Sequence, residues 1–287
     1  MEPTSPSRRL LWWLLWWLTR TKGRLQVLVL RVARAYIRAF HDCSYDYRLN
    51  GEQVLLHRLK SVGMNTIFDV GANLGDWSLL ARHAFPAAAI HAFELSDATR
   101  AVLRARLQSH DVRIVDAALG DLDGEIPFKD FGDCSGLNTV VTVTTFHDWR
   151  TPALRTAPIM RGETYCRRAP VERIDLLKID VEGYEGAVLE GFGALLTPAT
   201  VRCLQFEYGY GNGDMRWLMR DFVKFLGDRG YVVGKLWHDG VAFTPFEYSW
   251  NNFESGPNYV AVGRDDVELQ RAVARPSSLA GCSNGEA

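Results

Sequence analysis

Carboxylates follow two strand-like runs of this chain, and such side chains can do acid–base or metal chemistry. The segment "LLKIDVEGYE", residues 176–185, passes from apolar residues into Asp180 and Glu182, and "LQFEYG" reaches Glu207. Asp and Glu are almost never fully buried without a partner, so their place at the ends of buried runs needs a reason. Converging acids could take a proton from a substrate hydroxyl, or they could bind Mg²⁺ through oxygen ligands.

Strand alternation predicts where these acids point. Lys178, Asp180 and Glu182 would lie on one side of the strand, if extended geometry persists that far. The structural alternative is an ion pair of Lys178 with Asp180 or Glu182, and a further acid that stabilises the next helix. Three converging acids exceed what a helix N-terminus requires. We therefore predict a site with three catalytic candidates: Asp180, Glu182 and Glu207. His238 is an outside candidate for the base.

A glycine loop precedes these acids in the chain. "FDVGANLGDWS" places Gly71 and Gly75 between a predicted strand and a predicted helix, where the backbone can approach a nucleotide-type ligand closely. The spacing differs from the G-x-G-x-x-G pattern of dinucleotide sites, and Asp69 would repel a diphosphate. That carboxylate suits instead the cationic amino-acid portion of S-adenosylmethionine, which we predict as the cofactor. Strand–turn–helix packing alone is the alternative explanation of the glycines.

Two further strand ends supply candidate contacts with the same nucleotide. Glu94 ends the second predicted strand, where a carboxylate can accept hydrogen bonds from both ribose hydroxyls. NAD-dependent enzymes use an acid in the same way, so Glu94 does not distinguish the two cofactors. Asp116 and Ala117 end the third predicted strand and are expected to border the adenine. Four aromatic residues could form a wall for a sugar ring or could pack in the core: Tyr208, Tyr210, Trp237 and Trp250.

The elements that must position these residues alternate along the chain as in a βαβ sheet. Apolar, β-branched runs predict seven strands, at residues 66–72, 89–95, 112–118, 175–181, 201–209, 231–237 and 258–263. Helices are predicted between them at 76–84, 97–109, 184–196 and 214–229. An insertion at about 125–170 is expected to carry an extra hairpin at 139–146 and to shape the substrate site. Ligands of such sheets bind beyond the carboxyl ends of the strands, which brings the acids and the glycine loop to one edge.

The chain resembles the FkbM-type class I S-adenosylmethionine-dependent methyltransferases over about residues 63–263. The resemblance lies, in order, in "FDVGANLGDWS", "HAFE", "DAALGDLDG", "LLKIDVEGYEGAVLEG", "LQFEYG" and "PNYVAVG". It implies an α/β, Rossmann-like, seven-stranded sheet with an antiparallel last strand, and methyl transfer to a hydroxyl of a sugar, polyketide or related metabolite. It carries over the family's first cofactor motif to Asp69, Gly71, Asn73 and Gly75. It carries over the ribose-binding acid to Glu94 and the fourth-strand motif to Asp180 and Glu182.

The first forty residues differ in composition from the rest. They hold eight basic residues and one acidic residue, a local charge of +7, whereas the remaining residues sum to −8. The nine consecutive apolar residues at 10–18 would span about 13 Å as a helix, which is too short for a bilayer core of about 30 Å. Residues 20–38 predict a basic amphipathic helix, broken at Gly23. We expect residues 8–40 to lie on an anionic membrane surface; the alternative is a helical hairpin packed on the domain or on a sister subunit.

Composition bounds the remaining choices. The 287 residues divide into a helical extension (1–45), a methyltransferase domain (46–264) and a tail (265–287) that is expected to end in disorder. A net charge of −1 gives no reason to expect a nucleic-acid partner. The five cysteines are odd in number and lack zinc spacing, which favours a reduced, cytoplasmic protein. The basic N-terminal segment adds the expectation that it is peripheral on the inner face of the cell membrane. The sequence is compatible with a homo-oligomer.

These observations together predict an S-adenosylmethionine-dependent O-methyltransferase that acts on a hydroxyl of a sugar, glycan or related metabolite. Mg²⁺ is a second candidate cofactor, because the acids could act as a base or as its ligands. One alternative is an NAD-dependent oxidoreductase of Rossmann type, which Asp69 and the loop spacing oppose. Another is a noncatalytic, membrane-associated scaffold with the same fold. Calorimetric titration with S-adenosylmethionine and with NAD tests the first alternative, and a labelled-methyl transfer assay tests the second.

Overall fold

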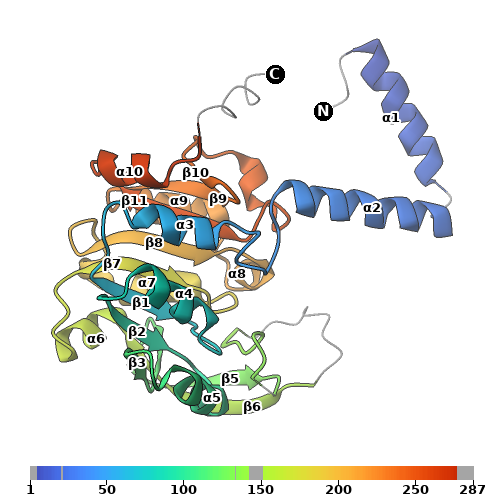
Figure 1. Cartoon of the computed structure of the whole chain (residues 1–287). Coiled ribbons are helices and arrows are strands. Elements are labelled where there is room, and N and C mark those ends of the chain that lie inside the picture. Colours follow the sequence, from blue (N-terminus) through green and yellow to red (C-terminus); the bar gives the residue numbers. More distant parts are fainter. Residues whose placement is uncertain (1–4, 21, 133, 142–150, 277–287) are drawn as a thin grey trace.

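An eight-stranded mixed sheet forms the centre of the described chain, which comprises residues 5–20, 22–132, 134–141 and 151–276 of the computed structural model (Figure 1). The strand order is β10-β9-β11-β8-β7-β1-β2-β3. The strands are β1 (Thr66–Val70), β2 (Ala89–Phe93), β3 (Val112–Val115), β7 (Ile174–Ile179), β8 (Val201–Glu207), β9 (Tyr231–Trp237), β10 (Gly240–Ala242) and β11 (Asn258–Gly263). The pairs among β3, β2, β1, β7 and β8 are parallel, whereas β11 is antiparallel to β8 and β9, and β10 to β9.

The seven predicted strands all lie in this sheet, and the Rossmann-like fold with an antiparallel last strand is confirmed. Central strands are apolar runs because helices cover both sides of them; all six residues of β7 are buried. Two details differ from the prediction. β3 stops at Val115, because the chain leaves the sheet before residue 118. β10 extends one edge through a hairpin with β9, and its three residues are too few to form a sequence pattern.

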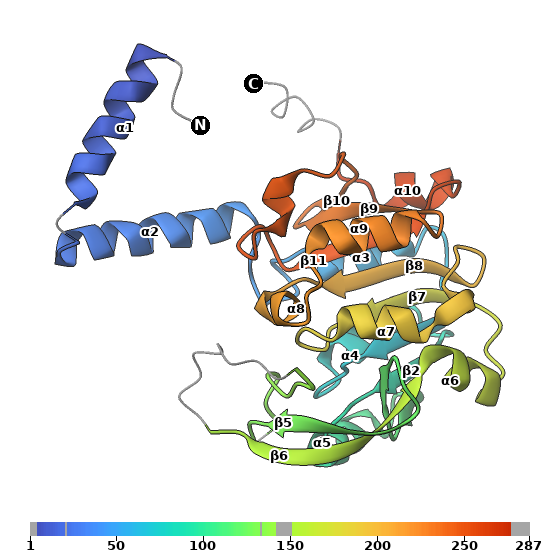
Figure 2. The same cartoon turned by 180° about the vertical axis from the view of Figure 1, so that it is seen from behind.

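Helices cover both faces of the sheet (Figures 1 and 2). One face carries α3 (Glu52–Leu59), α4 (Asp76–Ala84), α5 (Asp97–Leu107) and α10 (Val267–Val273); the other carries α6 (Gly162–Arg168), α7 (Glu185–Gly191) and α9 (Met219–Gly227). On the first face Leu55 of α3 packs in one cluster with Trp77 of α4. On the second face Phe222 of α9 stacks on Phe206 of β8, with ring centroids 5.0 Å apart. The apolar sides of these helices therefore build two core layers around the sheet.

The predicted helices differ from the observed ones at their ends. α4 has the predicted bounds, and α5 ends two residues earlier than predicted. The segment predicted at 184–196 becomes α7 and a single turn, η1 (Gly193–Leu195). The segment predicted at 214–229 becomes α9, because a separate helix, α8 (Tyr210–Asp214), occupies its start. The sequence patterns did not predict α3, α6, α8 or the turn η2 (Tyr248–Asn251).

The insertion carries a second sheet of its own, in the order β4-β6-β5. Its strands are β4 (Ala118–Gly120), β5 (Gly124–Asp130) and β6 (Ala153–Arg161), and β5 and β6 form the antiparallel pair. The hairpin predicted at 139–146 falls largely outside the described residues; within them, Thr139 makes one isolated bridge with Lys129. The tail predicted to be disordered also lies outside them from residue 277 onward.

Two helices precede the domain and extend away from it at one side, α1 (Pro6–Thr19) and α2 (Arg24–Phe40) (Figures 1 and 2). The predicted break at Gly23 is present, since Gly23 caps α2, and neither helix has a buried residue. The last turns of α2 join the extension to the domain: Arg34 lies 3.9 Å from Glu254, and Phe40 lies against Trp237 with ring centroids 6.3 Å apart. Among the described residues, no helix combines the length and the hydropathy needed to cross a membrane.

Candidate active site

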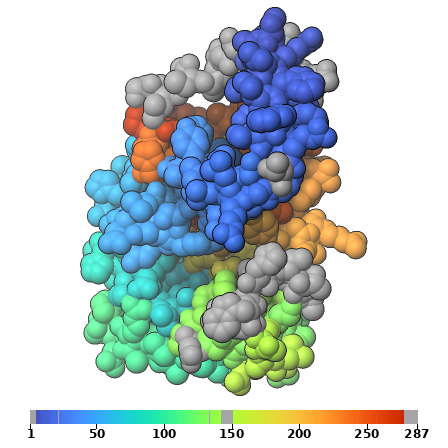
Figure 3. All heavy atoms as spheres, turned by 90° about the vertical axis from the view of Figure 1, so that its right-hand side faces the viewer, coloured from blue at the N-terminus to red at the C-terminus, as the bar shows by residue number. Residues whose placement is uncertain are grey.

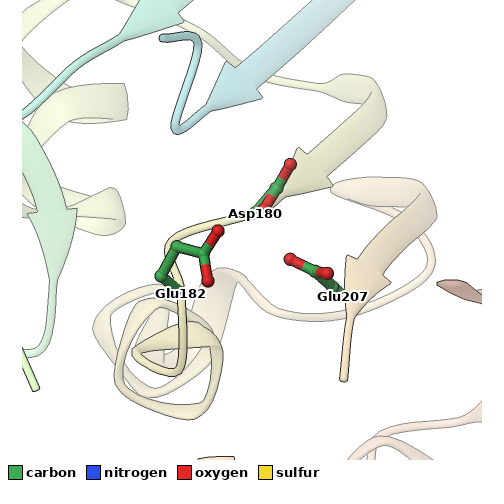
Figure 4. A group of neighbouring side chains, drawn as sticks. All are labelled: Asp180, Glu182 and Glu207. Atoms are coloured by element: carbon green, nitrogen blue, oxygen red, sulfur yellow. The ribbon is translucent and has the colours of Figure 1, made fainter. Parts of the chain in front are cut away.

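Three acidic residues lie together at the edge of the sheet, where β7 and β8 end (Figure 4). One carboxylate oxygen from each of Asp180, Glu182 and Glu207 lies within 4.8 Å of the other two. The alternation predicted through residue 182 does not hold, because β7 ends at Ile179 and Glu182 has a φ of +56°. The chain thus turns sharply after β7, and the turn brings Glu182 to the other two acids.

The turn at Glu182 is held by its surroundings. The Thr139 hydroxyl donates a 2.9 Å hydrogen bond to the Glu182 carbonyl, so the insertion contacts the turn directly. Glu185, at the start of α7, accepts hydrogen bonds from the backbone N–H groups of Val181 at 2.9 Å and Gly183 at 3.2 Å. A non-glycine residue in the left-handed region costs about 1–3 kcal/mol, and such residues cluster at functional sites. The strained position therefore favours a functional use of the Glu182 side chain.

Lys178 is the cation of this cluster. Its ammonium lies 3.1 Å from Asp69 Oδ1 and 3.3 Å from Asp180 Oδ2, and it donates a 3.1 Å hydrogen bond to the Gly71 carbonyl. Burial alone would lower the pKa of Lys178, but the neighbouring carboxylates, with Asp69 foremost, outweigh it and raise that pKa. Lys178 is therefore a charged, fully partnered side chain that ties the glycine loop to the acids. The ion pair with Asp180 that the sequence offered as the structural alternative is present.

Asp69 lies away from the cavities at this edge of the sheet, unlike the expectation that it meets the cationic end of a cofactor. It is fully buried on β1, where the Ser78 hydroxyl donates a 2.6 Å hydrogen bond to Oδ2. The cause is strand register: Asp69 pairs with Lys178 across β1 and β7, and both side chains point to the same face. The observed contacts give Asp69 the task of holding Lys178 in place.

The three clustered acids titrate differently because their surroundings differ. Burial would raise the pKa of Asp180, but the Lys178 ammonium and hydrogen bonds from Glu207 and Lys178 outweigh it, so the pKa is lowered. Burial and the charge of Asp180 raise the pKa of Glu182 to about 8. Burial and the charge of Asp180 also raise the pKa of Glu207 well above its usual value. At neutral pH the cluster thus holds an ionised Asp180 and a protonated Glu207, and Glu182 loses its proton just above neutrality.

A cavity of about 550 Å³ adjoins one side of the acid cluster. The glycine loop, the end of β2 and the insertion all contribute to its wall, so the insertion does shape a cavity at this edge. It is lined by Val70, Gly71, Asn73, Phe93, Glu94, Leu95, Ala118, Leu119, Ser135, Gly136, Asn138, Val140, Asp180, Val181, Glu182 and Tyr184. Its few convergent polar groups are typical of a small-ligand site. We refer to it as the first cavity.

Glu94 and Asn73 present polar atoms in the first cavity. Glu94 accepts hydrogen bonds from the backbone N–H groups of Asn73 and Ser96, at 2.9 Å each, which fixes its carboxylate. Asn73 itself has a φ of +45°, and its buried Oδ1 has no hydrogen-bond partner among the described residues. A buried acceptor without a partner is costly, so a ligand donor at this position would be favourable.

The remaining sequence-predicted cofactor residues lie beside the first cavity rather than in its lining. Asp116 is exposed and forms an ion pair with Arg104, and Ala117 is buried. The wall is formed instead by the following two residues, 118 and 119, because β3 ends early and β4 begins there. Gly75 caps α4 and packs against α5, where a Cβ would lie 2.6 Å from Leu103.

Gly71 offers a direct test of the loop. It has a φ of +80°, and a Cβ there would lie 1.7 Å from the backbone oxygen of Asp180. We expect Gly71→Ala to weaken binding of S-adenosylmethionine at least about tenfold and to lower the free energy of unfolding by about 2–4 kcal/mol, because the loop must move away from β7. Calorimetric titration and urea denaturation measure the two effects. Gly63→Ala is the matched control, since Gly63 has a φ of +69° and nothing within 4 Å; equal losses in both variants would contradict the explanation.

A second cavity, of about 690 Å³, adjoins the other side of the acid cluster. It is lined by Arg38, Cys43, Ser44, Tyr45, Glu182, Gly183, Glu185, Glu207, Tyr208, Gly209, Tyr210, Gly211, Asn212, Phe253, Glu254 and Pro257. Glu182 lines both cavities, whereas Asp180 lines only the first and Glu207 only the second. The acid cluster therefore stands at the boundary between two separate spaces.

Two of the four aromatic residues singled out in the sequence, Tyr208 and Tyr210, line the second cavity. Trp237 instead contacts Phe40 at the end of α2, and Trp250 packs in the core on Tyr259. The outside candidate for the base, His238, lies in neither cavity lining and is bound to Asp42, with 2.8 Å between Nδ1 and Oδ2.

Sequence reasoning missed several residues of the second cavity. Arg38 comes from α2, and Tyr45 follows it, although the extension was treated as separate from the catalytic domain. Phe253 and Glu254 come from an irregular segment between η2 and β11. No local pattern marks these positions, since only the tertiary fold brings them to the acids. The basic character of residue 38 on an amphipathic helix was the single available signal.

A model of the methyltransferase FkbM domain matches residues 69–233, more than half of the chain. The chain belongs to the FkbM methyltransferase family. The matched range includes the glycine loop, Glu94 and the whole acid cluster. The prediction of a methyltransferase of this family is confirmed. The family implies S-adenosylmethionine as the methyl donor and disfavours the NAD-dependent alternative.

Solved structures resemble the FkbM domain at low sequence identity. The FkbM methyltransferase from Methylobacillus flagellatus KT has a TM-score of 0.44 and 11% identity over 69% of this chain and 43% of that chain, so this chain spans less than half of its length. An O-methyltransferase from Bacillus cereus, in complex with SAH, has a TM-score of 0.39 and 11% identity over 82% and 88% of the two chains. The O-methyltransferase TomG from Streptomyces achromogenes, in complex with SAM, has a TM-score of 0.37 and 9% identity over 74% and 78%. No curated protein sequence matches the chain.

Proposed function

We propose that the protein transfers a methyl group from S-adenosylmethionine to a hydroxyl oxygen of a sugar or a related polyol, with Glu182 as the base. One observation carries the proposal: Glu182 lines both cavities, between Asp180 on one side and Glu207 on the other. A methyltransferase must bring donor and acceptor together in line at one point and remove the acceptor's proton there. A carboxylate shared by two cavities is suited to that task.

The first cavity fits the cofactor. The glycine loop in its wall is packed against the backbone of Asp180 at Gly71, and the buried Oδ1 of Asn73 has no hydrogen-bond partner among the described residues. Glu94, with its carboxylate fixed by two backbone N–H groups, would accept the ribose hydroxyls. Asp180 keeps a negative charge at neutral pH because Lys178 stabilises it. S-Adenosylmethionine bound there supplies an activated methyl group, and this carboxylate would attract its positive end.

Glu182 has the acidity that a base for a weakly acidic hydroxyl requires. Its raised pKa of about 8 makes it a stronger proton acceptor than an ordinary glutamate, and it still loses its own proton near physiological pH. Glu207 is protonated next to it and donates a hydrogen bond to Asp180, so it limits the negative charge of the cluster. The proton taken from the acceptor hydroxyl would rest on Glu182 and leave to water through the second cavity.

The second cavity has the chemistry of a polyol site. Tyr45, Tyr208, Tyr210 and Phe253 supply aromatic surface, against which the apolar face of a sugar ring can pack. Acidic side chains in the same lining can accept hydrogen bonds from hydroxyl groups. The lining holds one cation, Arg38, and four acids, of which Glu182 and Glu207 hold protons at neutral pH. The cavity therefore has no excess of positive charge, which favours a neutral, hydroxyl-rich acceptor over an anionic one.

The experiment that tests this function is transfer of a labelled methyl group to a panel of sugars, glycans and polyols, with the product bond identified by NMR. We expect an O-methyl ether. Labelling of nitrogen or carbon would overturn the assignment of a hydroxyl acceptor. Binding of S-adenosylmethionine with no transfer to the panel or to cell extract would support the noncatalytic scaffold instead.

The acid cluster also has the geometry of a cation site, because three carboxylate oxygens lie within 4.8 Å of one another. Lys178 already serves as the counter-ion of Asp180, however, and Glu207 holds a proton, so the base mechanism needs no further cation. We therefore expect turnover to persist after the protein is dialysed against EDTA and assayed in its presence. A loss of turnover that Mg²⁺ restores, and that monovalent salt does not, would assign the cluster to a divalent ion.

A further inference from the structure

The N-terminal helix α1 carries an apolar surface that nothing in the described chain covers. Its residues 10–18 are all Leu or Trp, and each exposes 37–70% of its surface. Because nine of them are consecutive, α1 is apolar on every side, which in water is unfavourable. The nine residues span about 13 Å, which is about half of the roughly 30 Å of a bilayer core. α1 is thus suited to burial within one leaflet.

α2 is exposed in the same way, but it has two different sides. Its arginines share one side: Arg24, Arg31, Arg34 and Arg38. Four of its exposed apolar residues lie together on the opposite side: Leu25, Val29, Val32 and Tyr36. Figure 3, which looks onto the side from which both helices project, shows α1 and α2 standing in front of the domain. A helix with these two sides is suited to lie in the plane of a membrane surface.

Charge distinguishes between the two partners that could cover these helices, an anionic bilayer and a second copy of the chain. Residues 1–40 carry +7, and the other residues carry −8. An anionic bilayer attracts the extension and repels the domain, which orients the molecule with the extension against the lipid. A second copy packed helix to helix would instead bring two groups of +7 together. The four tryptophans add a preference for the headgroup level of a bilayer. The lipid surface is the occupant that both the charge and the side chains favour.

We propose that α1 inserts into one leaflet of an anionic membrane while α2 lies along its surface, and that the acceptor is an amphiphile whose hydroxyl-bearing headgroup enters the second cavity. The acceptor follows from where α2 ends: Arg38, in its last turns, and residues 43–45 line the second cavity beside the acid cluster. The cavity therefore opens next to the segment that meets the lipid. The membrane contact stands by itself, and the identity of the acceptor rests on the proposed function.

Vesicle sedimentation of the full chain tests the membrane contact. The probes are phosphatidylcholine vesicles with and without phosphatidylglycerol. We expect binding to the anionic vesicles, weakened by salt, and at least about a tenfold loss of binding in Trp13→Glu/Trp17→Glu, because two exposed indoles leave the interface. Leu154→Glu/Tyr248→Glu is the matched control, since those side chains are 77% and 79% exposed on the domain; binding should not change. Absence of wild-type binding would overturn the proposal.

Sedimentation velocity of the same samples without lipid tests the competing occupant. A wild-type dimer that Trp13→Glu/Trp17→Glu converts to monomer, with no vesicle binding by either, would assign the helices to a second copy. Trp13 and Trp17 are exposed on α1 and line neither cavity, so both variants should keep their S-adenosylmethionine affinity. If Trp13→Glu/Trp17→Glu loses vesicle binding but keeps its affinity for S-adenosylmethionine, the membrane contact has failed while the methyltransferase site is intact.

Methylation of two matched acceptors tests the amphiphile. The probes are dodecyl glucoside incorporated in anionic vesicles and methyl glucoside in solution. We expect wild type to favour the dodecyl glucoside at least about tenfold in kcat/KM, and Trp13→Glu/Trp17→Glu to lose that preference while it uses methyl glucoside as well as wild type does. Equal use of both glucosides by wild type would overturn the amphiphilic acceptor. If the wild-type chain binds vesicles but methylates neither glucoside, the proposal of an amphiphilic acceptor would be overturned, and the membrane contact would stand.

Discussion

Glu182→Gln is expected to reduce kcat for methyl transfer by about 10²–10⁴, with little change in the affinity for S-adenosylmethionine. The amide keeps the size of the side chain and the hydrogen bond from Thr139 to the backbone carbonyl, but it cannot accept a proton. Single-turnover rates and calorimetric titration measure the two quantities. Glu190→Gln is the matched control, because Glu190 is an exposed acid on α7 outside both cavities.

The pH profile separates a base from a residue that merely positions the site. Glu182 acts only after it loses its proton, so kcat/KM of the wild type should rise with pH through its pKa of about 8 and level off above it. A bound sulfonium charge would move the inflection to lower pH, because it stabilises the carboxylate. The Gln variant should lose this inflection. A variant with unchanged turnover and an unchanged profile would remove Glu182 as the base.

Lys178→Met is expected to lower the free energy of unfolding by about 3–5 kcal/mol near pH 7. The apolar side chain leaves Asp69 and Asp180 without the buried ammonium that lies 3.1 and 3.3 Å from them. Urea denaturation measures the loss. The folded-state pKa of Asp180 is lowered by Lys178, so the stability that this pair contributes is present at neutral pH and is lost as pH falls through that pKa. The gap between variant and wild type should therefore narrow on acidification.

Lys224→Met controls for the loss of a lysine as such. Lys224 forms an i,i+4 pair with Asp228, and their side chains are 76% and 62% exposed. Surface pairs of this kind contribute little, so we expect almost no change in unfolding. If Lys178→Met were as stable as this control at neutral pH, Lys178 would not be the counter-ion of the two aspartates.

The sequence predicted the parts of the site that follow from local pattern. Apolar β-branched runs located β7 and β8, and the carboxyl ends of parallel strands meet at one edge, which brings Asp180 and Glu207 together. The glycine loop could be predicted from the sequence because its position between a strand and a helix requires glycine, and only glycine allows the close approach of residue 71 to the backbone of residue 180. These predictions depended on distances along the chain of a few residues, where pattern is informative.

The features that the sequence did not predict depend on contacts between distant segments. The turn that carries Glu182 to the cluster is held by Thr139 of the insertion, and the pairing of Lys178 with Asp69 needs the register of β1 and β7. Asp69 is a buried counter-ion of Lys178, a role that the sequence did not predict, and its contact with the cofactor stays a prediction. The wall formed by Arg38 and Tyr45 comes from the end of the N-terminal extension, which no motif connects to the acids.

A crystal structure with S-adenosylhomocysteine and a bound sugar is the most direct test of the account. We expect the nucleoside in the first cavity with its ribose hydroxyls on Glu94, and its sulfur directed toward the acid cluster. The sugar should lie in the second cavity with one hydroxyl oxygen in contact with the Glu182 carboxylate. A nucleoside away from Glu94, or a sugar hydroxyl out of reach of Glu182, would contradict the central claim that this carboxylate joins donor and acceptor.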